Sequence, residues 1–225
     1  MVAHRRCRYH RHVTRRKDSE LRADAADNRK RLLAAAREVF ATQGLDVSMR
    51  QIARHAGVSE PTLRRRFRDR EELITEVFAD NMERCAEAAE EALRDLDPWV
   101  GFTSFLRQLA TMQLTNVGFA EVLNMRFSSS TTHEQNRLRA WDSVELLIAR
   151  AKKAGRLRED FVSEDIVLLL LAHAGVVAGA GRVSQRMSDR LLAYLLQAFA
   201  APAAAGLPPA PSAAETYQAL LRPRT

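Results

Sequence analysis

The chain has 225 residues, of which 46% are hydrophobic, and this is enough for one compact domain or two small ones. Its formal net charge is +7. The two cysteines, Cys7 and Cys85, lack the CxxC spacing, which argues against a disulfide framework or a cysteine zinc site. The longest uncharged run, residues 166–181, is short and rich in glycine, so a cytoplasmic protein without a membrane span is expected.

The excess positive charge is concentrated at the N-terminus. Residues 1–17 contain seven basic residues and no acidic one, which leaves 28 basic residues against 28 acidic residues in the rest of the chain. We expect residues 1–22 to form a disordered basic arm. Such an arm suits a contact with nucleic acid, and the alternatives are a solvated extension or a start codon assigned too early.

Helical periodicity runs through almost the whole chain and strand-like alternation is missing, so an all-α protein of about nine helices is expected. The first helix is predicted at residues 25–42, where four apolar residues from Leu32 to Phe40 recur at helical spacing. Gly44 follows this helix in the position of a C-terminal glycine.

Two short helices follow. Ser48 and Gln51 have the spacing of a capping box, which opens the first of them. Gly57 breaks that helix, and Ser59 caps the next one, which carries Pro61 in its first turn.

The rest of the chain is also predicted to be helical. Asp69 is expected to start a long fourth helix that reaches Leu96 and is stopped by Asp97 and Pro98. Ser163 is expected to cap the eighth helix. The five helices after Pro98 are predicted at residues 99–115, 118–127, 132–154, 163–181 and 188–200. Residues 201–225 are rich in Pro, Ala and Ser, so they are expected to form a flexible tail.

The two short helices around the glycine have the pattern of a helix-turn-helix. Ile52, Ala56 and Val58 are expected to point inward, with Leu63 and Phe67 beneath the second helix. Glycine suits the turn because it adopts a positive φ at little cost. An ordinary corner between two helices is the alternative.

Five arginines lie within seven residues at the end of the second short helix. At about 100° per residue, its buried face leaves Arg65 pointing outward and Arg64 and Arg66 on the flanks. An outward arginine in a major groove can donate to O6 and N7 of a guanine, while Arg68 and Arg70 reach phosphates. A solvated surface charge is the alternative for each arginine.

The stretch RLLAAAREVFATQGLDVSMRQIARHAGVSEPTLRRRFRDREEL resembles the DNA-binding domain of the TetR family of bacterial transcriptional repressors, over about residues 28–75. The pattern is an AA-x-x-x-F helix, a glycine, Ser or Thr before the second helix, and I-A-x-x-A-G-V-S-x-x-T-L. The resemblance implies groove contacts by Glu60, Pro61, Thr62, Arg64 and Arg65, and backbone contacts by Ser48, Arg66 and Arg70.

The sequence departs from the family at three of these positions. Family members usually have tyrosine where Arg64 stands, commonly histidine where Arg66 stands, and usually lysine where Arg70 stands. Positive charge is kept or gained at each position, so DNA binding is still expected. The half-site that the protein reads is left open, because arginine replaces an aromatic ring.

The resemblance further implies a helix-turn-helix DNA-binding domain at residues 23–75 and a ligand-binding and dimerisation domain at residues 76–200. Two stripes suit the interface of a homodimer, and in the first of them small residues let helices approach closely. The stripes are Ala172, Gly175 and Gly179, and Leu192, Leu195, Leu196 and Phe199. The alternative is that both stripes face the subunit's own core.

Aromatic and sulfur-containing side chains are concentrated in residues 102–141, which suits a pocket for a small, largely apolar ligand. Ordinary core is the alternative for each of them, and a satisfied core histidine is the alternative for His173. The candidate ligand contacts are Phe102, Phe105, Met112, Phe119, Met125, Phe127, Trp141, Glu145 and His173.

Enzyme motifs are missing from the sequence, which lacks GxSxG, HExxH, P-loop and GxGxxG patterns. No catalytic residue, cofactor or metal site is therefore expected, and the group Cys7, His10 and His12 in the arm is set aside. The expected function is that of a homodimeric repressor released from a palindromic double-stranded DNA operator when the ligand binds. A structural or partner-binding helical protein is the alternative class.

Overall fold

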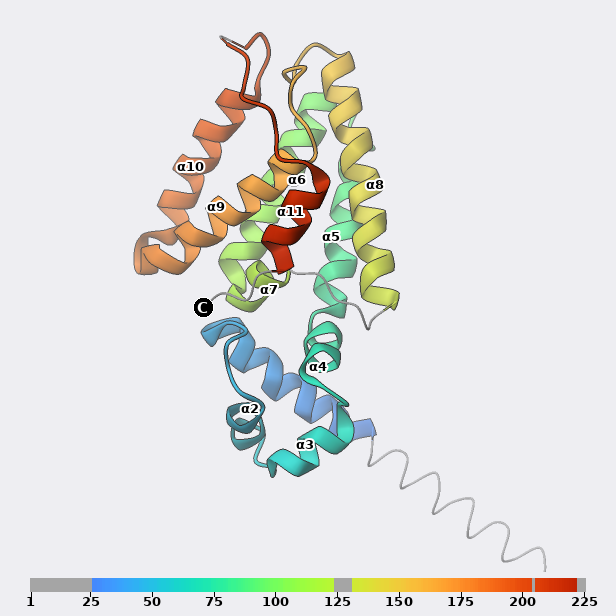
Figure 1. Cartoon of the computed structure of the whole chain (residues 1–225), viewed down its shortest axis with the longest axis vertical. Helices are drawn as coiled ribbons and strands as arrows, with labels where there is room; N and C mark the ends of the chain where they lie inside the picture. The colour runs from blue at the N-terminus through green and yellow to red at the C-terminus, as the bar shows by residue number, and fades with distance from the viewer. Residues whose placement is uncertain (1–25, 124–130, 204, 222–225) are drawn as a thin grey trace, which may run out of the picture.

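The computed structural model describes residues 26–123, 131–203 and 205–221, which form an elongated molecule of two helical parts (Figure 1). Within these ranges the chain forms α-helices and no β-strand, which confirms the expected all-α fold. The basic arm and two of the candidate ligand contacts, Met125 and Phe127, lie outside the described residues.

The smaller part lies at one end of the molecule and contains the first helix and three short helices (Figure 1). These elements are residues 26–43, α2 (Met49–His55), α3 (Glu60–Arg66) and α4 (Arg70–Val77).

The caps predicted for the short helices are confirmed. Ser48 and Gln51 form a reciprocal capping box, in which Ser48 Oγ accepts from Gln51 N (3.2 Å) and Gln51 Oε1 accepts from Ser48 N (2.9 Å). Ser59 Oγ accepts from Thr62 N (3.4 Å) at the start of α3. Gly57, between α2 and α3, has a φ of 69°, in the left-handed region that glycine enters cheaply.

The core of the smaller part lies beneath α2 and α3. Ile52, Leu63 and Phe67 are fully buried, and Ala56 and Val58 are partly buried against the same core. This packing confirms the inward positions that the helix-turn-helix pattern predicted.

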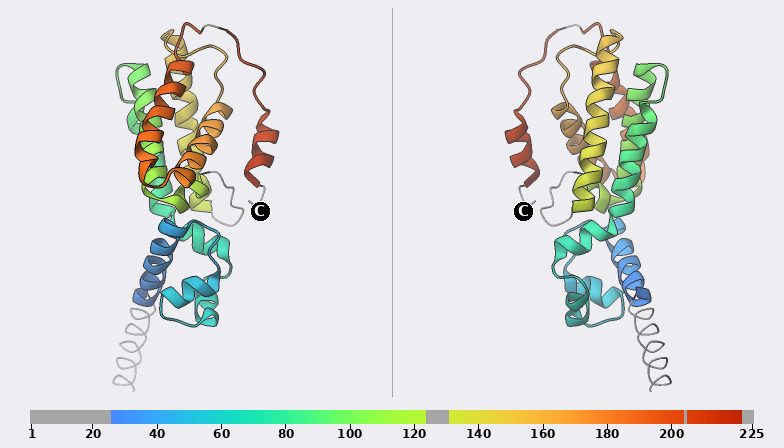
Figure 2. Two further views of the ribbon diagram at one scale, coloured as in Figure 1. Left: turned by 90° about the vertical axis from the view of Figure 1, so that its left-hand side faces the viewer. Right: turned by 90° about the vertical axis from the view of Figure 1, so that its right-hand side faces the viewer.

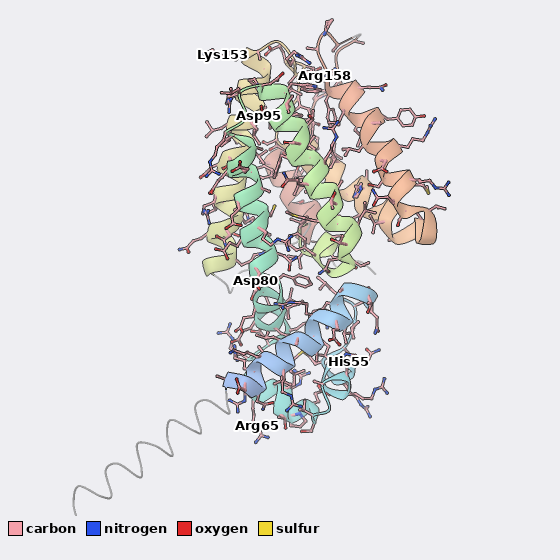
Figure 3. The ribbon with its side chains drawn as sticks, turned by 180° about the vertical axis from the view of Figure 1, so that it is seen from behind. His55, Arg65, Asp80, Asp95, Lys153 and Arg158 are labelled. Carbon is pink, nitrogen blue, oxygen red and sulfur yellow. The ribbon has the colours of Figure 1, made fainter. Side chains whose placement is uncertain are left out.

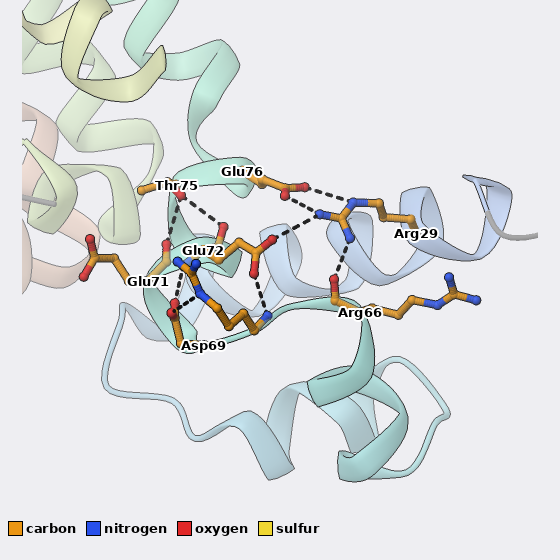
Figure 4. Close-up of polar contacts among 8 residues, drawn as sticks. Arg29, Arg66, Asp69, Glu71, Glu72, Thr75 and Glu76 are labelled. Atoms are coloured by element: carbon orange, nitrogen blue, oxygen red, sulfur yellow. Dashed lines mark hydrogen bonds and ion pairs between the residues drawn. The ribbon is translucent and has the colours of Figure 1, made fainter. Parts of the chain in front are cut away.

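Arg29, on the first helix, ties α3 and α4 together (Figure 4). Its Nη1 donates to the Arg66 carbonyl at the end of α3 (2.6 Å), and its Nε donates to Glu76 Oε2 on α4 (3.2 Å). The guanidinium carbon lies 4.4 Å from the centroid of the Phe67 ring, a cation–π contact. A terminal helix carbonyl has no partner within its own helix, so Arg29 supplies one and fixes the end of α3.

The expected long fourth helix is broken at Phe78, which corrects the sequence-based boundary. Phe78 has φ −103° and ψ 8°, and it separates α4 from α5 (Ala79–Ala92). Its fully buried ring lies between Phe40 and Phe119, at centroid distances of 6.0 and 6.1 Å. Periodicity within one helix does not reveal this kink, because the contacts that favour it come from residues distant in the sequence.

Asp97 and Pro98 begin a helix and do not end one. The preceding helix, α5, already ends at Ala92, and Asp97 Oδ1 accepts from Trp99 N (2.8 Å) and Val100 N (3.2 Å). Pro98 thus occupies the first turn, where its missing N–H costs little.

The larger part contains the remaining helices, with α6 in contact with α5, α7, α8, α9 and α10. In addition, α5 packs along α8, and α9 packs along α10 (Figure 2). The bounds are α6 (Pro98–Thr115), α7 (Val117–Val122), α8 (Thr131–Lys153), α9 (Glu164–Ala180), η1 (Gly181–Val183) and α10 (Ser184–Phe199).

Ser163 precedes α9 without capping it. No hydrogen bond from its side chain caps the helix, and its backbone is already helical, with φ −61° and ψ −29°. Asp165 Oδ2 instead accepts from Val162 N (2.9 Å), so the helical backbone begins slightly earlier than the serine suggests.

The segment expected as a flexible tail contains a helix, α11 (Ala213–Leu221), which packs against α9 (Figures 1 and 2). Together with the break at Phe78, it accounts for the difference between the nine expected helices and the eleven α-helices in the described part of the chain. None of the helices described is long and apolar enough to cross a membrane.

Replacing Arg29 with alanine is expected to loosen α3 and α4, because the Arg66 carbonyl and Glu76 lose a charged donor. Hydrogen bonds of charged groups contribute roughly 1.5–3 kcal/mol each, so amide exchange in residues 60–77 should accelerate at least tenfold. Hydrogen–deuterium exchange measured by mass spectrometry checks this expectation. Arg31→Ala, at an exposed site on the same helix, is the matched control and should leave the exchange rates unchanged.

Candidate nucleic-acid interface and ligand cavity

The outward face of α3 is exposed and basic. Leu63 and Phe67 are buried beneath this helix, while Arg64, Arg65 and Arg66 are exposed. Arg65 lies at the tip of the smaller part, at the end of the molecule far from the larger part (Figure 3). The angular positions expected from the sequence are thus the positions observed.

Two side chains of α3 accept hydrogen bonds from arginines one turn further along the helix. Arg64 Nε donates to Glu60 Oε1 (2.8 Å), and Arg65 Nη2 donates to Thr62 Oγ1 (3.3 Å). The Glu60–Arg64 pair is largely solvent-exposed, so it stabilises the helix only weakly. Arg64 can therefore leave Glu60 and pair with a phosphate instead. Pro61 is exposed on the same face, and the Ser48 hydroxyl is engaged in its cap.

Arg70 occupies a different environment from the one expected. Its guanidinium donates to the Val47 carbonyl and lies 6.0 Å from the centroid of the Phe40 ring. It is half-buried, and desolvation lowers its pKa, while Asp46 and Glu121 act in the opposite direction. Arg70 therefore braces the smaller part internally, and a phosphate contact would require it to leave Val47.

Two arginines on α2 extend the basic surface and were missed by the sequence analysis. Arg50 and Arg54 are exposed and lie four residues apart, so they share one face of α2. Their position on α2, on the side away from the buried Ile52 and Ala53, could have identified them from the sequence. With Arg64, Arg65 and Arg66 of α3, they bring the exposed arginines of the two helices to five.

The larger part encloses a mostly apolar cavity of about 190 Å³ between α5, α6, α7, α8, α9 and α11. Two of the expected ligand contacts, Phe105 and Trp141, line it. The other lining residues are Met82, Cys85, Leu109, Val122, Leu123, Arg137, Ala140, Val144, Glu164, Ile166, Val167, Leu170, Ala213 and Thr216.

The other candidate ligand contacts among the described residues do not line the cavity and lie in the core or on the surface. Phe102 lies in an aromatic cluster with Trp99 and Phe161, and Phe119 lies at the junction beside Phe78. Met112 and Glu145 are not among the lining residues. Met112 packs against the core, and Glu145 is exposed on α8.

His173 is a satisfied core histidine, as the alternative reading held. Its Nδ1 lies 2.7 Å from Gln113 Oε1, and its Nε2 lies 2.6 Å from Ser188 Oγ. All three residues are buried, and burial lowers the pKa of His173, which favours the neutral ring. The triad joins α6 to α9 and α10, and Gln113 Nε2 also donates to the Leu170 carbonyl (3.2 Å).

Arg137 is the cation in the cavity wall. It pairs with Glu134, with Nε 2.8 Å from Oε2, and its side chain is only 19% exposed. Arg137, Ala140, Trp141 and Val144 are spaced i, i+3, i+4 and i+7 on α8. A charge on an otherwise apolar stripe was therefore the sequence signal that could have located this wall of the cavity.

The two stripes expected at a dimer interface are separated by the structure. Leu192, Leu196 and Phe199 are buried in the subunit's own core, and Leu195 packs against that core. The small residues of α9, Ala172, Gly175 and Gly179, are exposed. A Cβ added at Gly175 or Gly179 would meet nothing within 4 Å, so this face of α9 is open among the residues that the structure describes.

α7 packs directly on the smaller part. A Cβ at Gly118 would lie 2.7 Å from the Phe40 carbonyl oxygen and 2.9 Å from Phe78 Cζ, so only glycine permits this approach. Glu121 Oε2 accepts a hydrogen bond from Leu45 N (2.8 Å), just after the first helix. α7 thus contacts the smaller part at two places, the last turn of the first helix and the residues just after it.

Over the residues that the structure describes, no group of three or more His, Cys, Asp or Glu side chains is arranged to hold a metal ion. Burial raises the pKa of the Cys85 thiol to about 12, so this thiol is protonated at neutral pH. The described side chains place basic donors at one end of the molecule and a largely apolar cavity in the larger part.

A helix-turn-helix with an exposed basic helix, joined to a helical domain with a cavity, defines a DNA-binding regulator of transcription. Two family models match the chain. Bacterial regulatory proteins, tetR family, match residues 32–77, and the transcriptional regulator SbtR-like C-terminal domain matches residues 97–200. The chain therefore belongs to the TetR family of bacterial transcriptional regulators.

Solved structures are similar to this chain, and the first two named here share its fold. The ketosteroid transcriptional regulator KstR2 of Mycobacterium tuberculosis is 17% identical over 76% of this chain and 94% of its own, with a TM-score of 0.56. FadR of Bacillus subtilis, solved with stearoyl-CoA, is 16% identical over 74% and 97%, with a TM-score of 0.52. The TetR regulator SCO0520 of Streptomyces coelicolor is 28% identical over 78% and 99%, with a TM-score of 0.49. No curated protein matches the chain.

Replacing Arg65 with alanine is expected to relax sequence preference at one base pair per half-site, because the outward guanidinium is positioned for a guanine edge. A bidentate contact of this kind is worth roughly 1–3 kcal/mol of discrimination. Binding-site selection with the variant protein measures the effect, and an unchanged preferred motif would rule Arg65 out as a base reader.

The matched control is Arg54→Ala on α2, which should weaken binding to all sequences alike. Each lost phosphate contact flattens the salt dependence of log K by about 0.9, so two contacts per dimer should change the slope by roughly 2.

Proposed function

We propose that the protein is a homodimeric repressor of the bacterial cytoplasm, which leaves a palindromic DNA operator when a small, largely apolar ligand fills the cavity. The observation that carries this proposal is the position of α7. Val122 at the end of this helix and Leu123 just after it line the cavity, and Glu121, the residue before them, accepts a hydrogen bond from Leu45 N of the DNA-binding part.

DNA recognition in this proposal uses the outward face of α3. The helix lies in the major groove with Arg65 directed at base edges. Arg64 and Arg66 meet the phosphates on either side, and Arg50 and Arg54 of α2 meet the backbone of one strand. The exposure of all five side chains supports these roles.

Dimerisation in this proposal uses the exposed face of α9 and α10, which forms one side of the molecule (Figure 2). Large apolar side chains lie there in the open, with Leu168 51% exposed and Tyr194 55% exposed. They share i, i+4, i+7 spacing with Ala172 and Gly175 on α9, which are exposed, and with the exposed Met187 and the half-buried Leu191 on α10. An apolar face beside exposed glycines is suited to pairing with a second copy.

Ligand release follows from the spacing that the DNA requires. The two α3 helices of a dimer must lie about 34–36 Å apart to occupy successive major grooves. A ligand that presses on Val122 moves Glu121 and, with it, the turn at Leu45, which changes the tilt of the smaller part. The ligand shifts this equilibrium only by the difference between its affinities for the two arrangements.

A gel shift with DNA from the promoter of the protein's own gene tests the DNA-binding part of the proposal. A complex at low micromolar protein that resists nonspecific competitor DNA is the expected result. Binding that is blind to sequence and lost in moderate salt would contradict a role as an operator-binding regulator.

Gly175→Leu is expected to give monomers, because the added side chain has open space within its own subunit and can clash only with a partner. Overfilling a close helix contact costs roughly 1–3 kcal/mol for each of two symmetric sites. Sedimentation velocity measures the oligomeric state, and an intact dimer would remove this face from the interface.

The matched comparison is Leu192→Ala on α10, which should leave the pairing intact. Leu192 is buried in the subunit's core, so its truncation should lower the free energy of unfolding by roughly 2–5 kcal/mol.

Ala140→Phe is expected to weaken operator binding without any ligand, because the new ring occupies the cavity that the ligand would fill. Coupling energies between sites are typically 1–3 kcal/mol, so the loss should lie between about 5-fold and 150-fold. In a Glu121→Gln background the loss should shrink, since the link between α7 and Leu45 is weakened. Fluorescence anisotropy with labelled operator DNA measures all four proteins.

Leu146→Phe, at an exposed site on the same helix, is the control for the added ring. An Ala140→Phe protein that binds operator as tightly as the parent would contradict ligand-driven release, and an equal loss in both backgrounds would exclude Glu121 from the coupling.

A further inference from the structure

The segment after α10 is an addition to the part of the chain that the C-terminal family match covers, since that match ends at residue 200. The segment passes over the end of the larger part and returns along its side, where α11 forms an outer layer (Figure 2). α11 forms part of the cavity wall there, because Ala213 and Thr216 belong to the cavity lining.

The base of this segment is held by an ion pair that we call the clasp, formed by Arg158 and Asp160. Arg158 Nη2 donates to Asp160 Oδ2 (2.9 Å) and to the Ala205 carbonyl (2.7 Å). Asp160 Oδ2 in turn accepts from Leu207 N (2.9 Å). The Arg158 side chain is only 8% exposed, so residues 205–207 are fixed at the end of the molecule opposite to Arg65 (Figure 3).

The contact of α11 with the domain is of a different kind. Its cavity-facing side presents a methyl group and a threonine to an apolar space, whereas the clasp holds residues 205–207 by charged hydrogen bonds. The helix starts with its own capping box, in which Ser212 Oγ accepts from Glu215 N (3.3 Å) and Glu215 Oε2 accepts from Ser212 N (2.8 Å). The capping box favours the first turn of α11, and the clasp keeps the segment tethered when α11 moves away.

Thr216 adds a chemical feature to the cavity. Its hydroxyl oxygen is buried and has no hydrogen-bond partner among the residues that the structure describes. A buried hydroxyl left unpaired costs free energy, so a ligand group that bonds with it is favoured. The remaining wall beside it is largely apolar, as Trp141 and Leu170 illustrate.

We propose that α11 is a tethered lid on the cavity, which opens to admit the ligand, and that Thr216 bonds with a single polar group on a compact, otherwise apolar molecule. The proposal rests on the proposed function only in treating the cavity as a ligand site. A cavity of about 190 Å³ takes a ligand of one or two rings when the lid is closed, since an enclosed apolar cavity of roughly 150 Å³ accommodates benzene.

The thiol of Cys85 reports on the lid, because it lines the cavity and is buried beneath it. In a Cys7→Ser background, dithionitrobenzoate is reacted with the full chain, with a chain that ends at Pro211, and with two point variants. Removing α11 should accelerate modification at least tenfold, since exposure also relaxes the pKa of the thiol toward its ordinary value. Equal rates of Cys85 modification in the full and shortened chains would show that α11 does not cover the cavity and would contradict the lid.

The point variants keep the chain intact. Thr216→Asp places a charge on the cavity side of α11 and should also accelerate modification, because a carboxylate facing an apolar cavity disfavours the closed position. Gln218→Asp adds the same charge at an exposed site on the same helix and should leave the rate unchanged. Acceleration by both variants alike would show a general loosening and would count against a lid. This assay needs neither DNA nor ligand, so it is independent of the repressor proposal.

The polar group is tested with naphthalene and 1-naphthol, which differ by one hydroxyl and are matched in size to the cavity. Both should bind the full chain in isothermal titration calorimetry, with 1-naphthol the tighter. Thr216→Val removes the hydroxyl at nearly constant volume and should weaken 1-naphthol about fivefold, the effect of one net hydrogen bond, while naphthalene is unaffected. Absence of binding by both probes, or an equal change for both, would overturn the assignment of Thr216 and of the ligand class.

Discussion

The burial of Phe78 between the two parts of the molecule is the contact on which the rest of the arrangement depends. Its ring lies between Phe40 of the first helix and Phe119 of α7, and the backbone changes direction at this residue. Both backbone groups of Phe78 are paired at this turn, since Phe78 N donates to the Ile74 carbonyl (3.1 Å) and its own carbonyl accepts from Met82 N (3.0 Å). As a result α4 belongs to the DNA-binding part and α5 to the cavity.

At this junction the two parts are in direct contact through α7. Gly118 brings the backbone of α7 against the Phe40 carbonyl, and close-packed contacts of this kind transmit displacement because they cannot be compressed. The same α7 continues into the cavity wall at Val122. Val122 in the cavity wall and Gly118 against Phe40 are therefore one helical turn apart on α7.

Local sequence signals predicted the features that local chemistry decides. The capping box at Ser48, the glycine turn between α2 and α3, and the outward position of Arg65 depend on residues within one or two turns of each other, so spacing alone locates them. The capping box at Ser212 was equally visible and was overlooked, because the surrounding proline and alanine suggested an unstructured tail.

Features decided by contacts between distant residues were not predictable in the same way. Periodicity shows that Leu192 lies on an apolar face of α10, but this helix has two apolar faces, and only the packing of α6 and α9 determines which is internal. The turn of Arg70 toward Val47 and the break at Phe78 likewise depend on neighbours distant in the sequence. The cavity wall was only partly predicted, because α5, α8 and α9 each contribute a few residues of unremarkable composition.

The Cys85 thiol in the cavity wall has a consequence for the kind of molecule the cavity can hold. With a pKa of about 12, only about one thiol in 10⁵ is ionised at pH 7, whereas an ordinary cysteine is ionised at the level of a few per cent. The thiolate is the species that attacks electrophiles and is oxidised. An electrophilic compound in the closed cavity would therefore meet a thiol of low reactivity.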